Sequence, residues 1–241
     1  MHTTLALVHP TDPVTAPDAT DVSRSALHEQ AAARLRTMLV EGQIPPGAKL
    51  NERELSEQLR VSRTPLREAI RTLAAEGLVD LMPNRGAIAV QMEEADIVDA
   101  FELLAELEGL SGELAAQRVT DAELTELQAL HFEMQACFAR RQLSGYYQLN
   151  ARIHSGINAA AKNPLLTRTY GQINARLQSL RFRSNQNEAK WKRAMQEHQT
   201  MIEALSERDA PALRAVLVTH LHGKRDTVLE LLRAASSSSG R

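Results

Sequence analysis

The sequence predicts a mainly α-helical protein in two parts, a small N-terminal unit with one β-hairpin and a larger unit made of helices alone. The chain of 241 residues is 43% hydrophobic but only 3% aromatic, so its core must be aliphatic. It is rich in Ala and Leu and poor in Gly, which favours helix. Apolar residues recur with helical spacing through most of the chain, and residues 78–90 alternate as a strand pair would.

Residues 25–91 form the predicted first unit, which opens with two helices. The first has a single apolar stripe and ends before the sequence PPG, which cannot continue a helix. Asn51, followed three residues later by Glu54, is a typical capping pair. It predicts a second, shorter helix that runs through Leu59.

A third helix is predicted in the stretch VSRTPLREAIRTLAAEG. We expect Thr64 as its N-cap and Pro65 as its first residue, where the missing N–H costs nothing, and Gly77 as its end. Residues 78–90 then alternate on either side of the sequence PNRG, which is typical of two strands joined by a turn. Three helices followed by a small hairpin describe a winged helix-turn-helix.

The third helix has a cationic face beside its apolar face. From Arg60 to Arg71 there are four arginines and one acid, Glu68. Ser62 and Thr64 add hydroxyl groups at the N-terminal end, where the helix dipole favours phosphate. A solvated surface helix could carry the same arginines. Its position as the second helix of a tight pair, before a basic hairpin tip, instead favours insertion into the major groove of DNA.

Beyond the hairpin the sequence shows helical stripes and no strand pattern. The loops between the stripes are short, so we expect an antiparallel bundle within residues 95–234. The segments 1–24 and 235–241 are expected to be disordered tails. The six predicted helices cover residues 95–116, 121–140, 145–161, 165–182, 187–206 and 210–234.

Three of the predicted bundle helices each place one histidine in the middle of a core-facing stripe. These residues are His154, His198 and His220. A single histidine in such a stripe is most often a core residue with a hydrogen-bond partner. Three separately buried imidazoles would need three partners, whereas one divalent metal would satisfy all three ring nitrogens at once. The sequence leaves both interpretations open at this point.

Charge and composition limit the class of protein. A formal net charge of −2 argues against extensive coating of nucleic acid or an acidic membrane, so an anionic partner must meet a local patch. A single cysteine, Cys137, excludes an intramolecular disulfide and suits a reducing cytoplasm. No apolar run is long enough for a signal peptide or a membrane span, so we expect a cytoplasmic protein with no membrane contact.

The segment IPPGAKLNERELSEQLRVSRTPLREAIRTLAAEGLVDLMPNRGAIAV resembles the DNA-binding domain of the GntR family of bacterial transcription regulators. The resemblance covers about fifty residues. It implies that the DNA-contacting residues are Arg53, Arg63, Thr64, Arg67 and the wing-tip Gly86, with Ser62, Pro65 and Arg85 at neighbouring positions.

The chemistry of arginine divides these residues further. A guanine edge accepts two hydrogen bonds from one guanidinium, and this is the commonest specific contact with DNA. We therefore expect Arg63 or Arg67 to read a guanine, while Arg53 is better suited to a phosphate.

The C-terminal part resembles the FCD ligand-binding domain of the FadR-like branch of the same family, over about residues 95–232. The resemblance implies a divalent metal, zinc, nickel or manganese, held by Asn150, His154, His198 and His220. Asn150 stands where family members usually have Asp, so we expect weaker binding or a shifted metal preference.

A second departure from the family concerns the effector. Leu104 stands where an Arg often helps to hold an anionic ligand. Arg152, Arg181 and Arg183 could take over this role for an organic acid. No organic cofactor is expected.

The predicted function is therefore a transcription regulator, expected to repress, that binds a palindromic double-stranded operator as a homodimer and responds to a small-molecule effector. Two half-sites require two recognition helices, and the first bundle helix has more apolar surface than one inward stripe needs. The alternative is a hydrolase with a three-histidine zinc site. It is disfavoured because the sequence offers no obvious general base near the histidines and because an enzyme would leave the winged helix unexplained.

Overall fold

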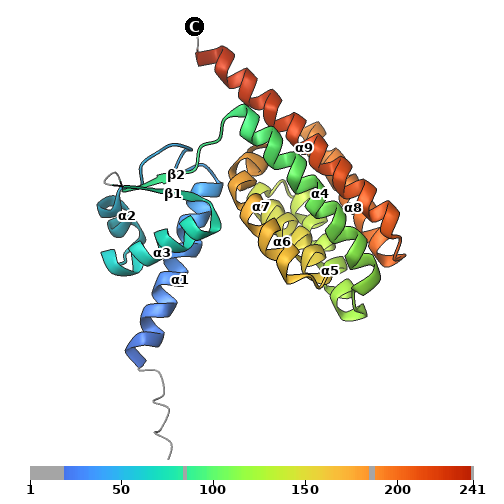
Figure 1. Ribbon diagram of the computed structural model, residues 1–241, viewed down its shortest axis with the longest axis horizontal. Helices are drawn as coiled ribbons and strands as arrows, with labels where there is room; N and C mark the ends of the chain where they lie inside the picture. Colours follow the sequence, from blue (N-terminus) through green and yellow to red (C-terminus); the bar gives the residue numbers. More distant parts are fainter. Residues whose placement is uncertain (1–18, 84–85, 185–187, 240–241) are drawn as a thin grey trace, which may run out of the picture.

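The computed structural model describes residues 19–83, 86–184 and 188–239. Within them the chain forms two units joined by a short extended segment, an N-terminal winged helix and a C-terminal bundle of helices (Figure 1). This confirms the predicted mainly α-helical fold and its order of elements. None of the described helices is long and apolar enough to cross a bilayer.

The winged helix packs three helices against a two-stranded hairpin. Leucine side chains from all three helices fill its core, among them Leu35, Leu66 and Leu73, which are fully buried. The hairpin is antiparallel, and Lys49 adds a bridge to its second strand. The elements are α1 (Ala19–Val40), α2 (Glu52–Leu59), α3 (Arg63–Glu76), β1 (Val79–Met82) and β2 (Gly86–Ala89).

The capping of α2 agrees with the prediction, but the start of α3 does not. The Asn51 side chain accepts hydrogen bonds from the backbone N–H groups of Arg53 and Glu54 at 3.1 and 3.5 Å. Helix α3 begins at Arg63 with Ser62 as its N-cap, so Thr64 and Pro65 are the second and third helical residues. Pro65 fits there because the N–H groups of the whole first turn lack an intrahelical acceptor.

In the described part of the chain the bundle consists of six helices, as the stripes predicted, and every boundary except the end of the last helix lies within two residues of the expected one. Helices α4 and α9 lie side by side along the length of the bundle, and α6 and α7 lie on its side toward the winged helix (Figure 1). The bounds are α4 (Glu94–Arg118), α5 (Asp121–Ala139), α6 (Leu143–Ala160), α7 (Pro164–Ser184), α8 (Glu188–Ser206) and α9 (Ala210–Ser239).

The first and the last helix along the chain, α1 and α9, are longer than predicted. Helix α1 begins at Ala19 rather than at Ser25, and α9 continues to Ser239 instead of ending at Ala234. In both places the sequence has no residue that would stop a helix: the last proline before α1 is Pro17, and the serine run of α9 lasts until the final glycine. Parts of both segments predicted as disordered tails are therefore helical.

Helix α7 of the bundle packs against the winged helix. Its Ala175 is buried in the core cluster of the winged helix. Nearby, the carbonyl oxygen of Gln172 and the side chain of Arg176 lie against Gly77, the C-cap of α3. Gly77 has a φ of +86°, which favours glycine, and a Cβ there would lie 3.2 Å from the Arg176 side chain, which would have to shift slightly to make room. The end of α3 is thus seated directly on α7.

Candidate nucleic-acid interface and metal centre

The N-terminal end of α3 is exposed and rich in hydrogen-bond donors. Ser62, Arg63 and Thr64 are all exposed, and the Ser62 side chain does not cap the helix. The free N–H groups of the first helical turn point in the same direction as the positive end of the helix dipole. This end of α3 therefore offers hydroxyl, guanidinium and backbone donors to a phosphate or a base edge.

The arginines of this region differ in whether an acidic side chain forms an ion pair with them. Arg67 is paired with Glu52 of α2 at 2.8 Å, Arg71 with Glu68 at 2.7 Å and Arg53 with Glu57 at 3.4 Å. Arg63 makes no ion pair with any described residue. The cationic face is consequently better balanced than the sequence suggested, because Glu52 reaches it from the preceding helix.

The remaining predicted DNA-contacting residues lie on both sides of α3. Gly86 is exposed at the start of β2 and has a φ of +83°, which suits glycine at the tip of a tight hairpin. Pro65 is half-buried. Arg85 lies outside the described residues.

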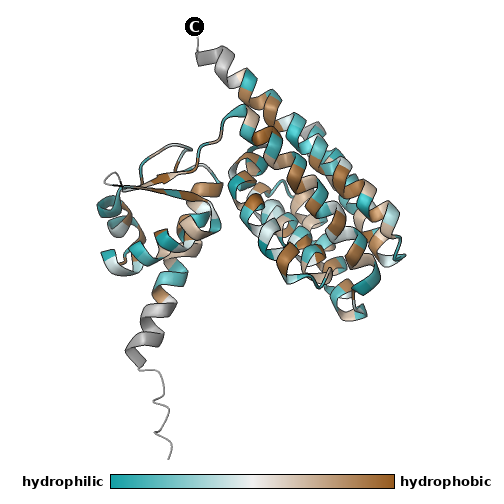
Figure 2. Cartoon of the chain, viewed as in Figure 1, coloured by the Kyte–Doolittle hydropathy of each residue, from teal (hydrophilic) through white to brown (hydrophobic). Residues whose placement is uncertain are grey.

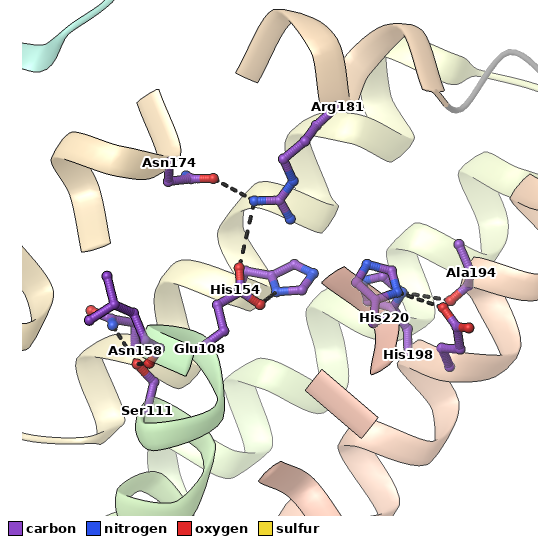
Figure 3. A network of polar contacts seen from close by, with 11 residues as sticks. Glu108, Ser111, His154, Asn158, Asn174, Arg181, Ala194, His198 and His220 are labelled. Atoms are coloured by element: carbon purple, nitrogen blue, oxygen red, sulfur yellow. Dashed lines mark hydrogen bonds and ion pairs between the residues drawn. The ribbon is translucent and has the colours of Figure 1, made fainter. Parts of the chain in front are cut away.

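In the bundle, the three predicted histidines come together. His154 of α6, His198 of α8 and His220 of α9 are fully buried, and their ring centroids are 5.0 to 5.3 Å apart (Figure 3). One ring nitrogen of each lies within 4.8 Å of those of the other two. We call these three residues the histidine cage.

A hydrogen bond fixes each ring of the cage through its Nδ1 atom. His154 donates to Glu108 at 2.7 Å, and His198 donates to the carbonyl oxygen of Ala194 at 2.7 Å (Figure 3). His220 donates to Glu197 at 2.6 Å. In a neutral imidazole whose Nδ1 donates such a hydrogen bond, the Nε2 atom keeps its lone pair. None of the three Nε2 atoms has a hydrogen-bond partner among the described residues.

Asn150 is the fourth residue of the predicted ligand set. It lies one helical turn before His154 on the same face of α6, is 3% exposed, and its Oδ1 has no hydrogen-bond partner in the described part of the chain. Several buried lone pairs without a donor are costly unless a cation or a water joins them. Three imidazoles and one amide oxygen are ligands that a divalent transition metal accepts.

Two carboxylates next to the cage were missed at the sequence level. Glu108 comes from α4, and Glu197 immediately precedes His198. The sequence offered no obvious general base near the histidines, and it gave no sign that these two carboxylates hold the rings of the cage. A periodicity argument treats Glu197 as a surface residue, and nothing in the sequence places α4 beside α6. Both carboxylates accept a hydrogen bond from an imidazole Nδ1, as is usual around metal-bound histidine.

The electrostatics of the cage follow from its burial. Burial opposes the charge of Glu108, but His154 and Arg181 outweigh it, and the pKa of Glu108 is lowered overall. Burial, together with the neighbouring imidazoles, lowers the pKa of His198 and His220 well below 6.5. The latter two rings are thus neutral at pH 7, the form that coordinates metal.

The three arginines proposed for an effector occupy different places. Arg181 is buried, lies 3.6 Å from Glu108 and donates to Asn174, so it belongs to the network behind His154 (Figure 3). Arg152 is exposed on α6 and pairs with Glu126 at 3.3 Å, and Arg183 is half-buried near the end of α7. Of these three arginines, only Arg181 contacts a residue that hydrogen-bonds a histidine of the cage, namely Glu108.

Two family models match the chain. Residues 27–88 match the model of bacterial regulatory proteins of the gntR family, and residues 99–223 match the FCD domain. The chain belongs to the GntR family of transcription regulators. Its two matched segments are the winged helix and the helical bundle, so the histidine cage lies inside the FCD domain.

Relatives of this GntR protein match over most of their length. The Nta operon transcriptional regulator of Aminobacter aminovorans is 30% identical over 198 residues, which cover 82% of this chain and 92% of the relative. The transcriptional repressor RspR of Escherichia coli K12 is 25% identical and is covered to 90%. The solved structure of E. coli McbR/YncC matches 86% of this chain and is itself covered to 98%, with a TM-score of 0.75 and 22% identity, which supports the fold.

Proposed function

We propose that this GntR protein represses transcription by binding a palindromic operator as a homodimer, and that a small organic acid bound beside a divalent metal in the bundle controls its operator affinity. The observation that carries the proposal is a set of four buried atoms that have no hydrogen-bond partner among the described residues: Nε2 of each histidine in the cage and Oδ1 of Asn150. RspR, one of the relatives, is named a repressor, which supports the direction of control.

The residues of the cage fit zinc, nickel or manganese, as the family resemblance implies. His154, His198 and His220 would supply three nitrogens, and Asn150 would supply an uncharged oxygen. When bound, a divalent ion offers an open coordination position to an oxygen of the effector. Glu108 and Glu197 would hold the imidazoles in orientation and raise their basicity.

A continuous set of contacts leads from the cage to the recognition helix. His154 is bonded to Glu108, which pairs with Arg181, and Arg181 donates to Asn174 of α7. Ala175, the next residue, is buried in the winged-helix core. An effector that shifts Glu108 or Arg181 would therefore act on the helix that supports the C-cap of α3, and about 1 to 3 kcal/mol of coupling is typical of such control.

The dimer would form through α4. Leu103 and Leu110 are 47% and 38% exposed, and seven residues apart they share one face of the helix. Hydrophobic residues are visible along α4 and the adjoining α9 among hydrophilic ones (Figure 2). Large apolar side chains at such a position favour a contact with a second copy of the chain.

The hydrolase alternative gains no support from the geometry. Glu108 and Glu197, the carboxylates in contact with the cage, each accept a hydrogen bond from a histidine Nδ1 and also contact an arginine. Neither is poised to take a proton from water. A panel of esters and lactams tests this alternative, since turnover that depends on zinc would favour an enzyme.

The decisive experiment measures operator binding as a function of metal and effector. The operator is first selected from random duplexes by the full-length protein, and affinity is then measured for metal-stripped and zinc-loaded protein with a panel of organic acids. We expect tight binding without acid, and release by at least one acid only when zinc is present. Binding that ignores both zinc and every acid would refute control from the cage while leaving DNA binding intact.

A further inference from the structure

A crevice lies at the seam between the two units, lined by α1 of the winged helix and by α6 and α7 of the bundle. Its volume is about 240 Å³. An apolar cavity of about 150 Å³ has room for benzene, so this crevice has room for one or two fused rings. It is too small for a helix, which is about 10 Å wide with its side chains, so the occupant that fits it is a small molecule. We call it the seam crevice, and its lining residues include Val40, Ser144, Tyr147, Gln148, Gln178 and Phe182.

The buried part of the lining is aromatic. The rings of Tyr147 and Phe182 meet edge to face with their centroids 5.2 Å apart, and Val40 packs with them in one buried cluster. The hydroxyl proton of Tyr147 is already used, because it is donated to the carbonyl oxygen of Gln178 at 2.9 Å. Aromatic rings prefer to pack on other rings by offset stacking or edge to face, so this wall favours a flat aromatic ligand.

The charges around the seam crevice are already compensated. Each of its three charged side chains has a partner, so a charged ligand would either lack a counter-charge or break an existing contact. Charge complementarity therefore favours an uncharged ligand. The pairs are Arg36 with Glu76 at 2.6 Å, Arg152 with Glu126 at 3.3 Å, and Glu41 with the hydroxyl of Ser144, which donates to it.

Two side-chain amides supply the polar part of the crevice. Gln148 is exposed on α6 and Gln178 is half-buried on α7, and neither amide has a hydrogen-bond partner among the described residues. An amide can both donate and accept, so either one can bind a hydroxyl or an N–H group. A pure hydrocarbon would cover these amides without giving them a partner, which is costly.

We propose that the seam crevice is a ligand site for a small uncharged aromatic compound with one hydroxyl or ring N–H group, such as a phenol or an indole. The ring lies against Tyr147 and Phe182, and its polar group lies toward Gln148 and Gln178. Because both units line the crevice, an occupied crevice favours the arrangement of winged helix and bundle described here. The lining includes no histidine of the cage and neither Glu108 nor Glu197, so the fate of this site is separate from that of the proposed function.

Two substitutions fill the crevice from opposite walls. Ala151 is half-buried on α6 and lines the crevice, and Ala151→Leu places a larger apolar side chain there while keeping a strong helix former. Thr37 is exposed on α1 and lines the facing wall, where Thr37→Phe adds a ring. Ala159→Leu is the matched control, since Ala159 is exposed on α6 and does not line the crevice.

The experiment is a thermal-shift panel on full-length, metal-stripped protein with phenol, indole and 2-naphthol. Benzoate and benzylamine test the effect of charge, and cyclohexanol tests the need for an aromatic ring. A ligand at ten times its Kd should raise the midpoint of thermal unfolding by about 3 °C. We expect this for at least one of the first three compounds and for none of the other three. Ala151→Leu and Thr37→Phe should abolish the shift, and Ala159→Leu should keep it.

Three outcomes would overturn the proposal. The first is the absence of a shift in the wild type with phenol, indole and 2-naphthol. The second is a shift of equal size in the wild type and in the two filled variants, which would place the binding elsewhere. The third is a shift with benzoate or benzylamine as large as that with phenol, which would contradict the uncharged ligand class. If Ala151→Leu fails to fold, Thr37→Phe at its exposed position decides the matter.

Discussion

Glu108 of α4 accepts a hydrogen bond from Nδ1 of His154 of α6 at 2.7 Å, and both side chains are buried. This contact fixes which nitrogen of His154 carries its proton and turns Nε2 toward the other two histidines. The carboxylate is itself kept charged by His154 and by Arg181, 3.6 Å away. Glu108 thereby connects the cage to the helix that supports the winged helix.

Replacing Glu108 with Gln should weaken zinc binding by about 10- to 100-fold, because the amide no longer orients the imidazole or raises its basicity. Competition against a zinc chelator of known affinity measures the change. Glu106→Gln, on the same helix but exposed and paired with Arg214, is the matched control and should leave zinc affinity unchanged. Equal zinc affinities for Glu108→Gln and the wild type would show that the hydrogen bond serves packing alone.

Asn150 gives a prediction in the opposite direction. Replacing it with Asp adds a negative charge of nearly the same shape beside the three imidazoles, so zinc affinity should rise, whereas Asn150→Ala should lower it. In the metal-stripped protein, Asp should instead lower stability, since an uncompensated buried charge is costly. Metal titration and thermal unfolding of both variants measure these effects. A loss of zinc affinity in Asn150→Asp would remove this residue from the ligand set.

The sequence predicted more of the fold than of the environment of the site. Helical stripes located six bundle helices and put His154, His198 and His220 on their core-facing sides, but they left open whether the three rings meet. The sequence could not predict that Glu108 is a partner of the cage. Glu108 lies 46 residues before His154 in the chain, and only tertiary packing brings the two side chains together. Helix ends were also imprecise, as at Ser62, where proline statistics favoured a start two residues later than the observed one.

Arg63 is the exposed arginine of α3 for which no acid competes, so it should contribute most to sequence recognition. Arg63→Ala should cost about 1 to 3 kcal/mol on the selected operator and relax the preference at one base pair. Arg71→Ala removes an arginine that Glu68 already pairs, and it should change affinity much less. Fluorescence anisotropy on the operator and on each single-base variant tests both. An unchanged base preference in Arg63→Ala would make this residue a phosphate contact.

The α4 face predicts how the protein assembles. Replacing Leu103 and Leu110 together with Lys should convert a dimer to monomers, because like charges would face each other across a two-fold axis. Light scattering gives the mass, and operator affinity should fall with it, since one monomer reaches one half-site. Leu165→Lys is the control: this leucine is 67% exposed on α7, and its replacement should preserve the dimer. A double variant that stays dimeric would move the interface away from α4.

Acid should destabilise the metal-stripped protein through the cage. The pKa of His198 and His220 lies well below 6.5 in the folded state, chiefly because of burial, while in the unfolded chain it is the ordinary value of about 6.5. Between these values the unfolded chain binds more protons than the folded chain, so the free energy of unfolding falls as the pH drops below about 6.5.

Urea titrations at several pH values between 5.5 and 7.5 measure this dependence. His198→Asn removes one titrating ring and should give a shallower slope, while His28→Gln, outside the bundle, should keep the wild-type slope. Zinc-loaded protein should lose stability more steeply over the same range, because protons and metal compete for the same nitrogens. If stability in the metal-stripped wild type did not change across this range, His198 and His220 would have to be protonated in the folded state, and their neutral, metal-ready form would be wrong.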